Sequence, residues 1–480
     1  MPPRLAKEEG ESLMTMHRRS LLKLASGLTA VTLASHALGH RPRPSRVRRD
    51  VCILGGGSSG THAALRLRDL GSSVALVERT HRLGGHAQTY FDDASGVPIN
   101  IGVVVFENVE LVRDYFARLN VSAIPADFSG PPPLPIDFST GRLVEDYAPP
   151  DPAAAGAALY AYRQILAQKL PYLDDGFELP ARVPEDLAMP FGRFVEKYSL
   201  QALFPTVFLF GQGLGDILAA PSIYVLKNFS AAVVDSILGT GFLTVPAGVS
   251  TIYDGAALEL GSDVLYESKV LSVERGCRGQ YPISVKLSTP EGEVVVESKK
   301  LLVAFPPSPK GFASFDFTGS ERSLFSSFRP NHYSTGVVRL SGISDATTLQ
   351  NTGNRTPYAL PSLPGVYALS PTGAPGLWNV KYGSPTLLED RAVQQAIARD
   401  VRRIARAGSA PVSLEGFAIF RNHSPFELMA SSREVASGFY RRVNGLQGFR
   451  DTFYTGATFQ THDSSLIWRF NESLLPKMFT

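Results

Sequence analysis

Cysteine is scarce in this chain, since 480 residues contain only Cys52 and Cys277. Two cysteines cannot form a disulfide framework, and no CxxC or HExxH pattern supplies the ligand spacing of a zinc site. Runs long enough to cross a membrane are lacking too: the apolar stretch 24–38 has 15 residues, whereas a membrane-spanning helix needs about 20. The sequence therefore predicts no metal site and no transmembrane segment in the mature chain.

A strong excess of either charge is also missing. Lys and Arg number 47 against 44 Asp and Glu, which gives a net charge of +3. Residues 1–50 hold ten of the basic residues and four of the acidic ones, so the rest of the chain is slightly acidic. This balance argues against nucleic-acid binding, because such proteins carry a basic patch for the phosphates. With 44% hydrophobic and 19% charged residues, the composition is typical of a globular protein that buries a small-molecule ligand.

We interpret residues 1–47 as a leader. Arg18, Arg19 and Lys23 precede the apolar stretch, and small residues near Ala37 suit cleavage, as in a secretory signal peptide. The run RRSLLK at 18–23 also resembles a bacterial twin-arginine export signal, so Tat export stays an alternative. A retained amphipathic leader without a targeting role is a third reading. Residues 40–49 (HRPRPSRVRR) are expected to form an extended linker before the folded body.

The asparagines favour a eukaryotic secretory route. Five of the eleven stand in N-x-S/T sequons, whereas chance predicts roughly one or two. The five are Asn120, Asn228, Asn354, Asn422 and Asn471. We therefore expect a secreted glycoprotein or a protein of the secretory pathway.

The body of the chain opens with a strand–helix–strand pattern. Residues 51–54 (VCIL) have the character of a buried strand, and folding is expected to begin at Arg49. Residues 58–70 carry a helical apolar stripe that Gly71 ends, and residues 74–77 (VALV) form a second short strand before Glu78. About thirty residues thus complete a β-α-β unit, with Cys52 buried in its first strand.

The turn of this unit carries a glycine motif. Gly55-Gly56-Gly57-Ser58-Ser59-Gly60 matches G-x-G-x-x-G after a strand and at the start of a helix. Gly55 permits the tight turn, Gly57 lets the backbone approach a diphosphate, and Gly60 lets the helix pack on the strand. The helix start, at Ser58 and Ser59, offers amide groups and partial positive charge to the phosphates. The pattern predicts a dinucleotide site, with Glu78 as the carboxylate that accepts the ribose hydroxyls.

One rival reading applies to the same residues, because GGSSG also fits the G-x-S-x-G nucleophile elbow of α/β-hydrolases. Such an elbow follows several earlier strands, whereas this serine follows the first one. The hydrolase reading is therefore disfavoured.

Beyond Glu78 the chain continues as Arg79-Thr80-His81-Arg82-Leu83-Gly84-Gly85-His86. Here it resembles the flavin-containing amine oxidase superfamily, whose fingerprint runs from the ribose-binding acid through a basic loop to a Gly-Gly pair. The resemblance implies FAD as the cofactor and a Rossmann-type FAD fold. His86 stands where an arginine is usual in the family. Within the superfamily the chain is most similar to a branch that contains beta-cyclopiazonate dehydrogenase and polyunsaturated fatty acid isomerase.

Later segments extend the resemblance. Pro246-Ala247-Gly248 with a helix over 251–260 is similar to the family's second flavin segment, and the run 263–273 would present Val270 to the adenine. Residues 301–307 resemble the strand that leads to a proline-rich crossover. Residues 453–456 and a helix over 464–470 resemble the closing strand and helix under the flavin, although Ala457 stands where an acid often holds the ribityl chain. Asp463 or Ser464 is the expected N-cap of that helix.

The resemblance implies a division of the chain and a set of cofactor contacts. The fold class is α/β, with a doubly wound FAD domain formed by 48–110, 242–306 and 445–480, and an interleaved α+β substrate domain formed by 111–241 and 307–444. The implied cofactor-binding residues are Gly55, Gly57, Ser58, Ser59, Gly60, Glu78, Arg79, Arg82, Gly84, Gly85, His86, Gly102, Val103, Val270 and Gly456.

The segments assigned to the substrate domain carry less specific sequence signals. Residues 130–152 form a proline-rich connection, and 153–170 and 387–407 have helical patterns, the latter with Val393, Ile397, Val401 and Ile404 on one face. Residues 191–229 hold eight Phe and Tyr side chains that fit either a hydrophobic substrate pocket or an ordinary helical core.

Catalytic residues are the least determined part. Flavin chemistry needs positioning and a dry pocket more than a nucleophile, so no fixed motif is expected. Phe106, Tyr454, His462 and Trp468 are the candidate neighbours of the flavin, each with a structural role as its alternative. Covalent attachment of the flavin through His86 or His462 is conceivable.

Three functions fit these patterns. The first is an FAD-dependent oxidase or dehydrogenase that takes hydride onto flavin N5 from a hydrophobic or amine-bearing metabolite, with O2 as one possible acceptor. The second is a flavin-dependent double-bond isomerase of an unsaturated, lipid-like substrate. The third is a non-catalytic flavoprotein.

Overall fold

The computed structural model of the chain describes residues 44–308 and 311–479. Residues 44–480 form one compact unit. Most of the expected leader, residues 1–43, lies outside the described residues, so its roles stay predictions.

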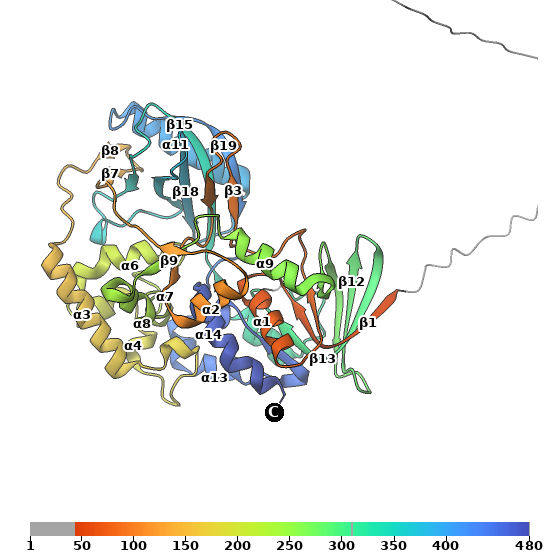
Figure 1. Ribbon diagram of the computed structural model, residues 1–480. Coiled ribbons are helices and arrows are strands. Elements are labelled where there is room, and N and C mark those ends of the chain that lie inside the picture. The colour runs from red at the N-terminus through yellow and green to blue at the C-terminus, as the bar shows by residue number, and fades with distance from the viewer. Residues whose placement is uncertain (1–43, 309–310, 480) are drawn as a thin grey trace, which may run out of the picture. The chain divides into compact units, whose positions relative to one another are not determined.

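A seven-stranded sheet forms the first layer of this unit (Figure 1). Five of its strands run parallel: β10 (Val264–Leu265), β2 (Val74–Val77), β1 (Ser45–Leu54), β13 (Gly292–Val303) and β21 (Thr452–Tyr454). Two antiparallel strands, β12 (Ile283–Thr289) and β11 (Lys269–Arg275), extend it beyond β13. The hydrophobic run 51–54 lies in the centre and is fully buried, as parallel strands covered on both faces require.

The first strand begins earlier than the sequence predicts. Strand β1 starts at Ser45 rather than near Arg49, and Ser45–Arg49 pair with residues 294–298 of β13. The expected linker over 40–49 and the leader boundary at 47 therefore overlap a strand. Arg46 and Arg48 both bind Glu297 of β13, so basic side chains that look like a linker belong to the end of the sheet, where β1, β13 and β12 pair.

The expected helices flank this sheet. Helix α1 (Ser58–Asp69), helix α9 (Ser250–Leu260) and helix α14 (Ser464–Leu474) match the predictions to within a few residues. Their apolar faces share one hydrophobic cluster with Val51, Ile53 and Trp468. Asp463 is the N-cap of α14, since its side chain accepts a hydrogen bond from the Leu466 amide at 3.0 Å. This arrangement confirms the α/β fold class.

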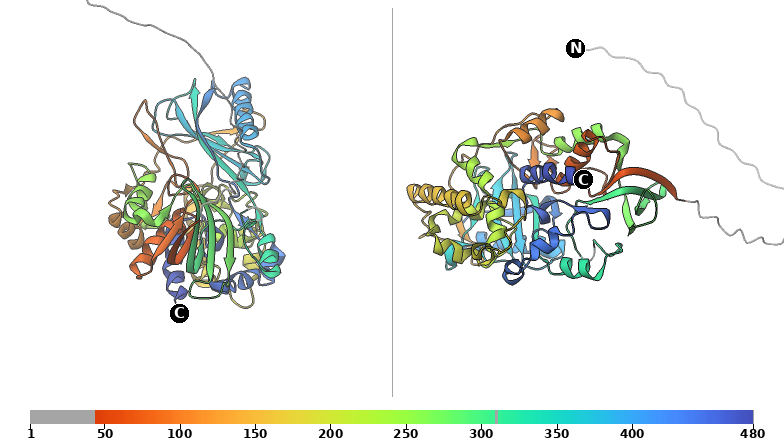
Figure 2. Two further views of the ribbon diagram at one scale, coloured as in Figure 1. Left: turned by 90° about the vertical axis from the view of Figure 1, so that its right-hand side faces the viewer. Right: turned by 90° about the horizontal axis from the view of Figure 1, so that it is seen from below.

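A second seven-stranded sheet lies in a separate layer, as the left view of Figure 2 shows. Its order is β19 (Ser413–Asn422), β15 (His332–Ser341), β18 (Leu377–Ser384), β17 (Gly365–Pro371), β16 (Leu349–Asn351), β7 (Leu134–Asp137) and β8 (Arg142–Leu143). Helix α11 (Asp390–Arg406) covers one face with Val393, Ile397, Val401 and Ile404, the predicted stripe. The hairpin β3 (Thr89–Phe91) and β4 (Pro98–Asn100) packs against the opposite face.

Strands β7 and β8 correct the expectation of a proline-rich connection over 130–152. Strand β7 pairs with β16 in parallel and β8 pairs with β7. The prolines hid this hairpin because they break the alternation that predicts strands, although Pro135 lies within β7 and pairs in register with Gln350 of β16.

Helices form a third group, at the lower left of Figure 1. They are α3 (Pro152–Lys169), α4 (Glu185–Ala188), α5 (Phe191–Lys197), α6 (Phe204–Phe210), α7 (Ser222–Asn228) and α8 (Ala231–Asp235). Phe191, Phe194, Phe204 and Phe229 are at most 1% exposed and lie in the largest hydrophobic cluster. Most aromatics of 191–229 are therefore core residues, as the simpler of the two readings expects.

Shorter elements complete the described chain. They are α2 (Glu110–Arg118), α10 (Gly319–Ser326), α12 (Ser432–Ala436), α13 (Phe439–Asn444), β5 (Phe106–Glu107), β6 (Ile124–Pro125), β9 (Phe242–Thr244), β14 (Arg329–Pro330) and β20 (Leu428–Met429). Within residues 44–308 and 311–479, no helix is long and apolar enough to cross a bilayer.

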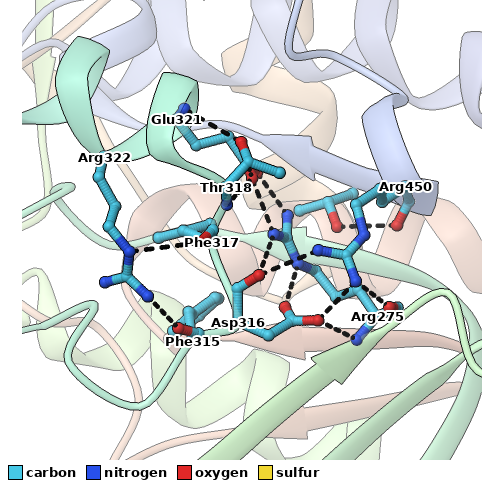
Figure 3. Close-up of polar contacts among 9 residues, drawn as sticks. Arg275, Phe315, Asp316, Phe317, Thr318, Glu321, Arg322 and Arg450 are labelled. Atoms are coloured by element: carbon cyan, nitrogen blue, oxygen red, sulfur yellow. Dashed lines mark hydrogen bonds and ion pairs between the residues drawn. The ribbon is translucent and has the colours of Figure 1, made fainter.

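A buried ion-pair network, drawn in Figure 3, ties β11 to α10 and to the segment before β21. Arg275 of β11 is fully buried and binds Glu321 at 2.7 Å and Asp316 at 2.8 Å. Arg450 also binds Asp316 and donates to the carbonyl of Arg275. The network fixes the approach to β21, whose end contributes to the site described next.

Candidate functional site

The predicted glycine turn lies at the carboxyl end of β1, where it joins α1. A Cβ at Gly60 would lie 1.9 Å from the carbonyl oxygen of Gly55, so only glycine lets α1 start against the strand. Gly55 has φ +108°, a conformation that other residues rarely adopt. At Gly57 the surroundings are open: an added Cβ would meet only the Cα of Gly85, at 3.9 Å. The turn is thus tight at two glycines and open at the third.

The start of α1 leaves amide groups free for a ligand. Its N-cap is Gly57, which has no side chain to accept from them. The first amides of a helix lack intrahelical partners and carry partial positive charge. Ser58 is half-buried. This end of α1 therefore suits a diphosphate.

Glu78 lies at the end of β2 beside this turn. Its carboxylate accepts hydrogen bonds from the amides of Gly56 and Thr80, both at 2.8 Å. It is 7% exposed, so its position is held before any ligand arrives. A carboxylate fixed at the second strand of such a unit is the group that binds ribose hydroxyls.

The loop of Gly84 and Gly85 runs alongside the turn. The Gly84 amide donates to the Gly56 carbonyl at 2.8 Å, and Gly84 forms a parallel bridge with Gly57. A Cβ at Gly85 would lie 3.1 Å from the Gly57 Cα. Two glycine segments that are 28 residues apart thus lie backbone to backbone, as the family fingerprint implies.

The closing segment of the chain joins the same place. Gly456 follows β21 with φ +101°, and its Cβ position lies 3.9 Å from the Cβ of Ser59. Thr455 Oγ1 lies 2.8 Å from Ser59 Oγ and donates to Asn471 at 2.6 Å. Ser58 accepts a hydrogen bond from Trp468 Nε1 at 3.0 Å. The carboxyl ends of β1, β2 and β21 therefore meet, where open α/β sheets bind their ligands.

The other implied cofactor residues have more varied places. Arg82 donates to the carbonyls of Leu83, at 3.1 Å, and of Ala87, so it shapes its own loop, whereas Arg79 is exposed. A Cβ at Gly102 would lie 1.8 Å from the His86 carbonyl oxygen, so that glycine lets the two segments touch. Val103 and Val270 are half-buried, Val103 after Gly102 and Val270 in β11.

These groups fit FAD. The open space at Gly57, the uncapped start of α1 and the fixed carboxylate of Glu78 match a diphosphate with an attached ribose. Gly55, Ser58, Gly60, Gly84, Gly85 and Gly456 would hold it at the same edge. The nucleophile elbow of a hydrolase is not formed, because the hydroxyl of Ser58 donates to the hydroxyl of Ser464 at the start of α14.

Three of the four candidate catalytic aromatics are core residues. Phe106 and Trp468 stack at 5.7 Å and are at most 2% exposed. Tyr454 is 1% exposed and contacts Phe325 and Phe459. These three side chains therefore serve as packing residues beneath the site, which is the structural role that we considered as the alternative for each.

His462 is placed differently. It belongs to a row of four rings in the order His423, His86, Phe426 and His462. Successive ring centroids lie 4.3, 6.0 and 3.8 Å apart, with interplanar angles of 22° or less. His86, the second ring, follows Gly85, so this ring row passes the glycine loop. It brings together residues from three distant segments.

Glu427 completes the end of the ring row. Its Oε2 lies 3.3 Å from His462 Nε2, and the Phe426 carbonyl lies 3.1 Å from the same nitrogen. Two oxygens at one nitrogen indicate that Nε2 carries the hydrogen, because a carbonyl can only accept. Burial raises the pKa of Glu427 to about 8, and it lowers the pKa of His462 to about 3. His462 is thus neutral around pH 7, with Nδ1 as the unprotonated nitrogen.

A buried lysine holds the segment that precedes His462. Lys227 of α7 is 1% exposed and donates to the carbonyls of Leu173, at 2.7 Å, and Gly176, at 2.9 Å, and to Gln460 Oε1. Burial lowers its pKa to about 7, against the opposing effect of Asp174 and Glu427. Lys227 therefore fixes the segment that carries His462.

Sequence patterns did not identify several of these residues. Lys227, His423 and Glu427 belong to no motif that predicts a role at the site, and Asn471 stands out in the sequence only as part of a sequon. The one available signal was the rarity of buried Lys and Glu, which becomes visible only once burial is known. Among the described residues, no cluster of His, Cys, Asp and Glu could hold a metal ion.

Comparisons with known proteins agree with this geometry. The family model described as flavin containing amine oxidoreductase matches residues 58–333, more than half of the chain. An FAD-dependent oxidoreductase of Colletotrichum higginsianum is 36% identical over 461 residues, which cover 93% of this chain and 96% of that protein. The beta-cyclopiazonate dehydrogenase of Aspergillus flavus is 33% identical and covers 95% and 99% of the two chains.

Solved structures show the same fold. A fatty acid isomerase from P. acnes superposes with a TM-score of 0.72 at 19% identity and covers 90% of this chain and 99% of that one. A putrescine oxidase superposes with a TM-score of 0.62 at 15% identity, with 90% and 99% coverage. Together with the glycine turn, Glu78 and the Gly84–Gly85 loop, these matches lead to one conclusion: the chain belongs to the flavin containing amine oxidoreductase family and is an FAD-dependent oxidoreductase.

Proposed function

We propose that this FAD-dependent oxidoreductase oxidises a small, hydrophobic or amine-bearing metabolite by transfer of a hydride to flavin N5. The observation that supports this proposal most directly is the ring row, which runs from His423 past the glycine loop to the neutral imidazole of His462. Such a surface suits an apolar substrate and keeps water away from the reacting carbon.

Bound FAD supplies the acceptor for two electrons and one hydrogen. The chain supplies position and a base. When a carbon loses hydride, the attached O–H or N–H group must lose a proton, and His462 Nδ1 is unprotonated and free to accept it. No hydrogen bond from this nitrogen occurs in the described part of the chain.

Glu427 would stabilise the imidazolium that results. An ionised carboxylate 3.3 Å from Nε2 favours the charged ring. Because the pKa of Glu427 is raised to about 8, this support grows as the pH rises through that value. We therefore expect flavin reduction by substrate to accelerate between pH 7 and pH 9.

Anaerobic mixing tests the proposal. The chain loaded with FAD is mixed, without O2, with hydrophobic alcohols, amines and unsaturated acids, and its absorption is followed near 450 nm. Bleaching with an oxidised product supports the proposal. A rearranged product with oxidised flavin would instead indicate a double-bond isomerase, and no response to any compound would indicate a non-catalytic flavoprotein.

The acceptor and the location of the protein belong to the same proposal. Admission of O2 after reduction should restore the flavin and release hydrogen peroxide if O2 is the acceptor. A secretory route is supported by the sequence of the leader and by two exposed sequons, Asn120 and Asn354. Expression in a eukaryotic host with analysis of the medium tests it.

A further inference from the structure

The second sheet presents a face toward the ring row. Along β15 and β18, Val338, Val380 and Tyr382 pack under α11. Neighbouring residues of a strand point to opposite faces, so Tyr333, Thr335 and Lys381 lie on the other face, which we call the inner face. Thr335 and Lys381 are register partners.

The inner face meets the ring row directly. The Tyr333 ring lies 4.8 Å from Phe426 and 6.2 Å from His423, centroid to centroid. The Tyr333 carbonyl accepts a hydrogen bond from the His423 amide at 2.9 Å. Lys381 stands two residues from Gly383, the register partner of Tyr333. It therefore lies on the face that borders the proposed substrate site.

Lys381 has no hydrogen-bond or ion-pair partner among the residues that the structure describes. Within residues 44–308 and 311–479 it makes no hydrogen bond and no ion pair, although it is only partly exposed. Burial lowers its pKa, and no acidic group offsets this effect. Two other cations differ: Lys227 of α7 has three oxygen acceptors, and Arg421, a register partner of Thr335, donates to Gln88 at 3.0 Å.

The residues that surround Lys381 on the sheet offer no negative charge. Its cross-strand and same-face neighbours are Thr335, Asn379, Gly383 and Ala368. An ammonium held among apolar and neutral groups without an acceptor is costly, and proteins keep such groups where a ligand completes them. An oxyanion of a bound ligand would supply the acceptor that the Lys381 ammonium lacks.

We propose that Lys381 binds the acidic group of the substrate, so that the metabolite this site oxidises is an organic acid. This inference rests on the proposed function and names its substrate class. A carboxylate suits this role, since it places a negative oxygen against the ammonium. The apolar part of the substrate then extends over Tyr333 toward the ring row. An ammonium substrate is disfavoured, because Lys381 and Arg421 would repel it.

Three probes of equal chain length test the charge preference. Decanoate, decan-1-ol and decylamine are titrated at pH 7 into the full chain loaded with FAD, and their affinities are measured by calorimetry. A hydrogen bond to a charged group is stronger than a neutral one, so we expect decanoate to bind about 10- to 100-fold more tightly than decanol. Decylamine should bind most weakly.

Substitutions then assign the preference to one residue. Lys381→Met keeps the length of the side chain and should abolish the advantage of decanoate, whereas Lys381→Arg should keep most of it. Lys286→Met is the control, because Lys286 pairs with Glu293 at 2.9 Å at an exposed position of β12. Retention of the FAD absorption shows that each variant is folded.

The inference is wrong if wild-type protein binds decanoate no better than decanol, if it prefers decylamine, or if the preference survives in Lys381→Met. These outcomes differ from failure of the proposed function. A decanoate preference lost in Lys381→Met, in a protein whose flavin no compound reduces, would leave the acid site standing and refute the oxidation. Reduction of the flavin by a neutral compound, without any preference for acids, would support the oxidation and refute the acid site.

Discussion

Replacement of Gly57 by valine separates cofactor binding from folding. Gly57 has φ −75° and ψ −172°, which valine adopts without strain. An added Cβ would meet only the Gly85 Cα, at 3.9 Å, so the apoprotein has room for it. The cost to folding comes from the N-cap position, where valine is less favourable than glycine, and we expect at most about 1 kcal/mol.

The same side chain occupies the space that the diphosphate needs. Overpacking costs about 1–3 kcal/mol, and each lost hydrogen bond to a charged phosphate costs about 1.5–3 kcal/mol. One clash and one lost bond together cost about 3–6 kcal/mol, which corresponds to a loss of about 10²- to 10⁴-fold in FAD affinity. The purified variant should be colourless.

A matched variant at Gly60 should behave in the opposite way. Its Cβ would lie 1.9 Å from the Gly55 carbonyl oxygen and 3.1 Å from the Ala304 Cβ. Gly60→Ala should therefore unfold at clearly lower urea concentration even without cofactor. The assay is FAD titration of the apoprotein, followed by flavin fluorescence, together with urea unfolding of both variants. Normal pigment in Gly57→Val, or a stable Gly60→Ala, would refute this reading of the turn.

Three further predictions concern buried groups and the surface. Glu321→Gln should destabilise the protein by about 3 kcal/mol in urea unfolding, because it leaves Arg275 buried with one carboxylate fewer. His62 is 1% exposed and its pKa is lowered to about 3 by burial, so the folded state stays neutral while the unfolded state gains a proton below pH 6.5. The free energy of unfolding therefore falls by about 1.4 kcal/mol per pH unit as the pH drops from 6.5 toward 3. His62→Gln should remove this part of the pH dependence. In a eukaryotic host, peptide mapping should find glycan at exposed Asn120 and none at Asn471, which is fully buried against Ser59 and Thr455.

The cofactor half of the molecule could be predicted because its signals are local. Helix α1, strand β2 and the turn between β1 and α1 are encoded within thirty residues, where glycine geometry and hydrophobic periodicity act over short distances. The resemblance to a known family then identified the Gly84–Gly85 loop and distant segments such as 246–248 and 453–456. The start of β1 at Ser45 was missed, since its arginines have no hydrophobic alternation and pair only with a strand some 250 residues later.

The ring row could not be predicted in this way. His86, His423, Phe426 and His462 stack only because a glycine loop, the end of β19 and the segment before α14 converge. Burial decides the charge of Glu427 and leaves Lys381 without a partner, and burial is a property of the packed molecule. Short-range geometry in the chain thus predicted a dinucleotide site and the resemblance implied FAD, whereas contacts between remote segments decided which side chains form the ring row.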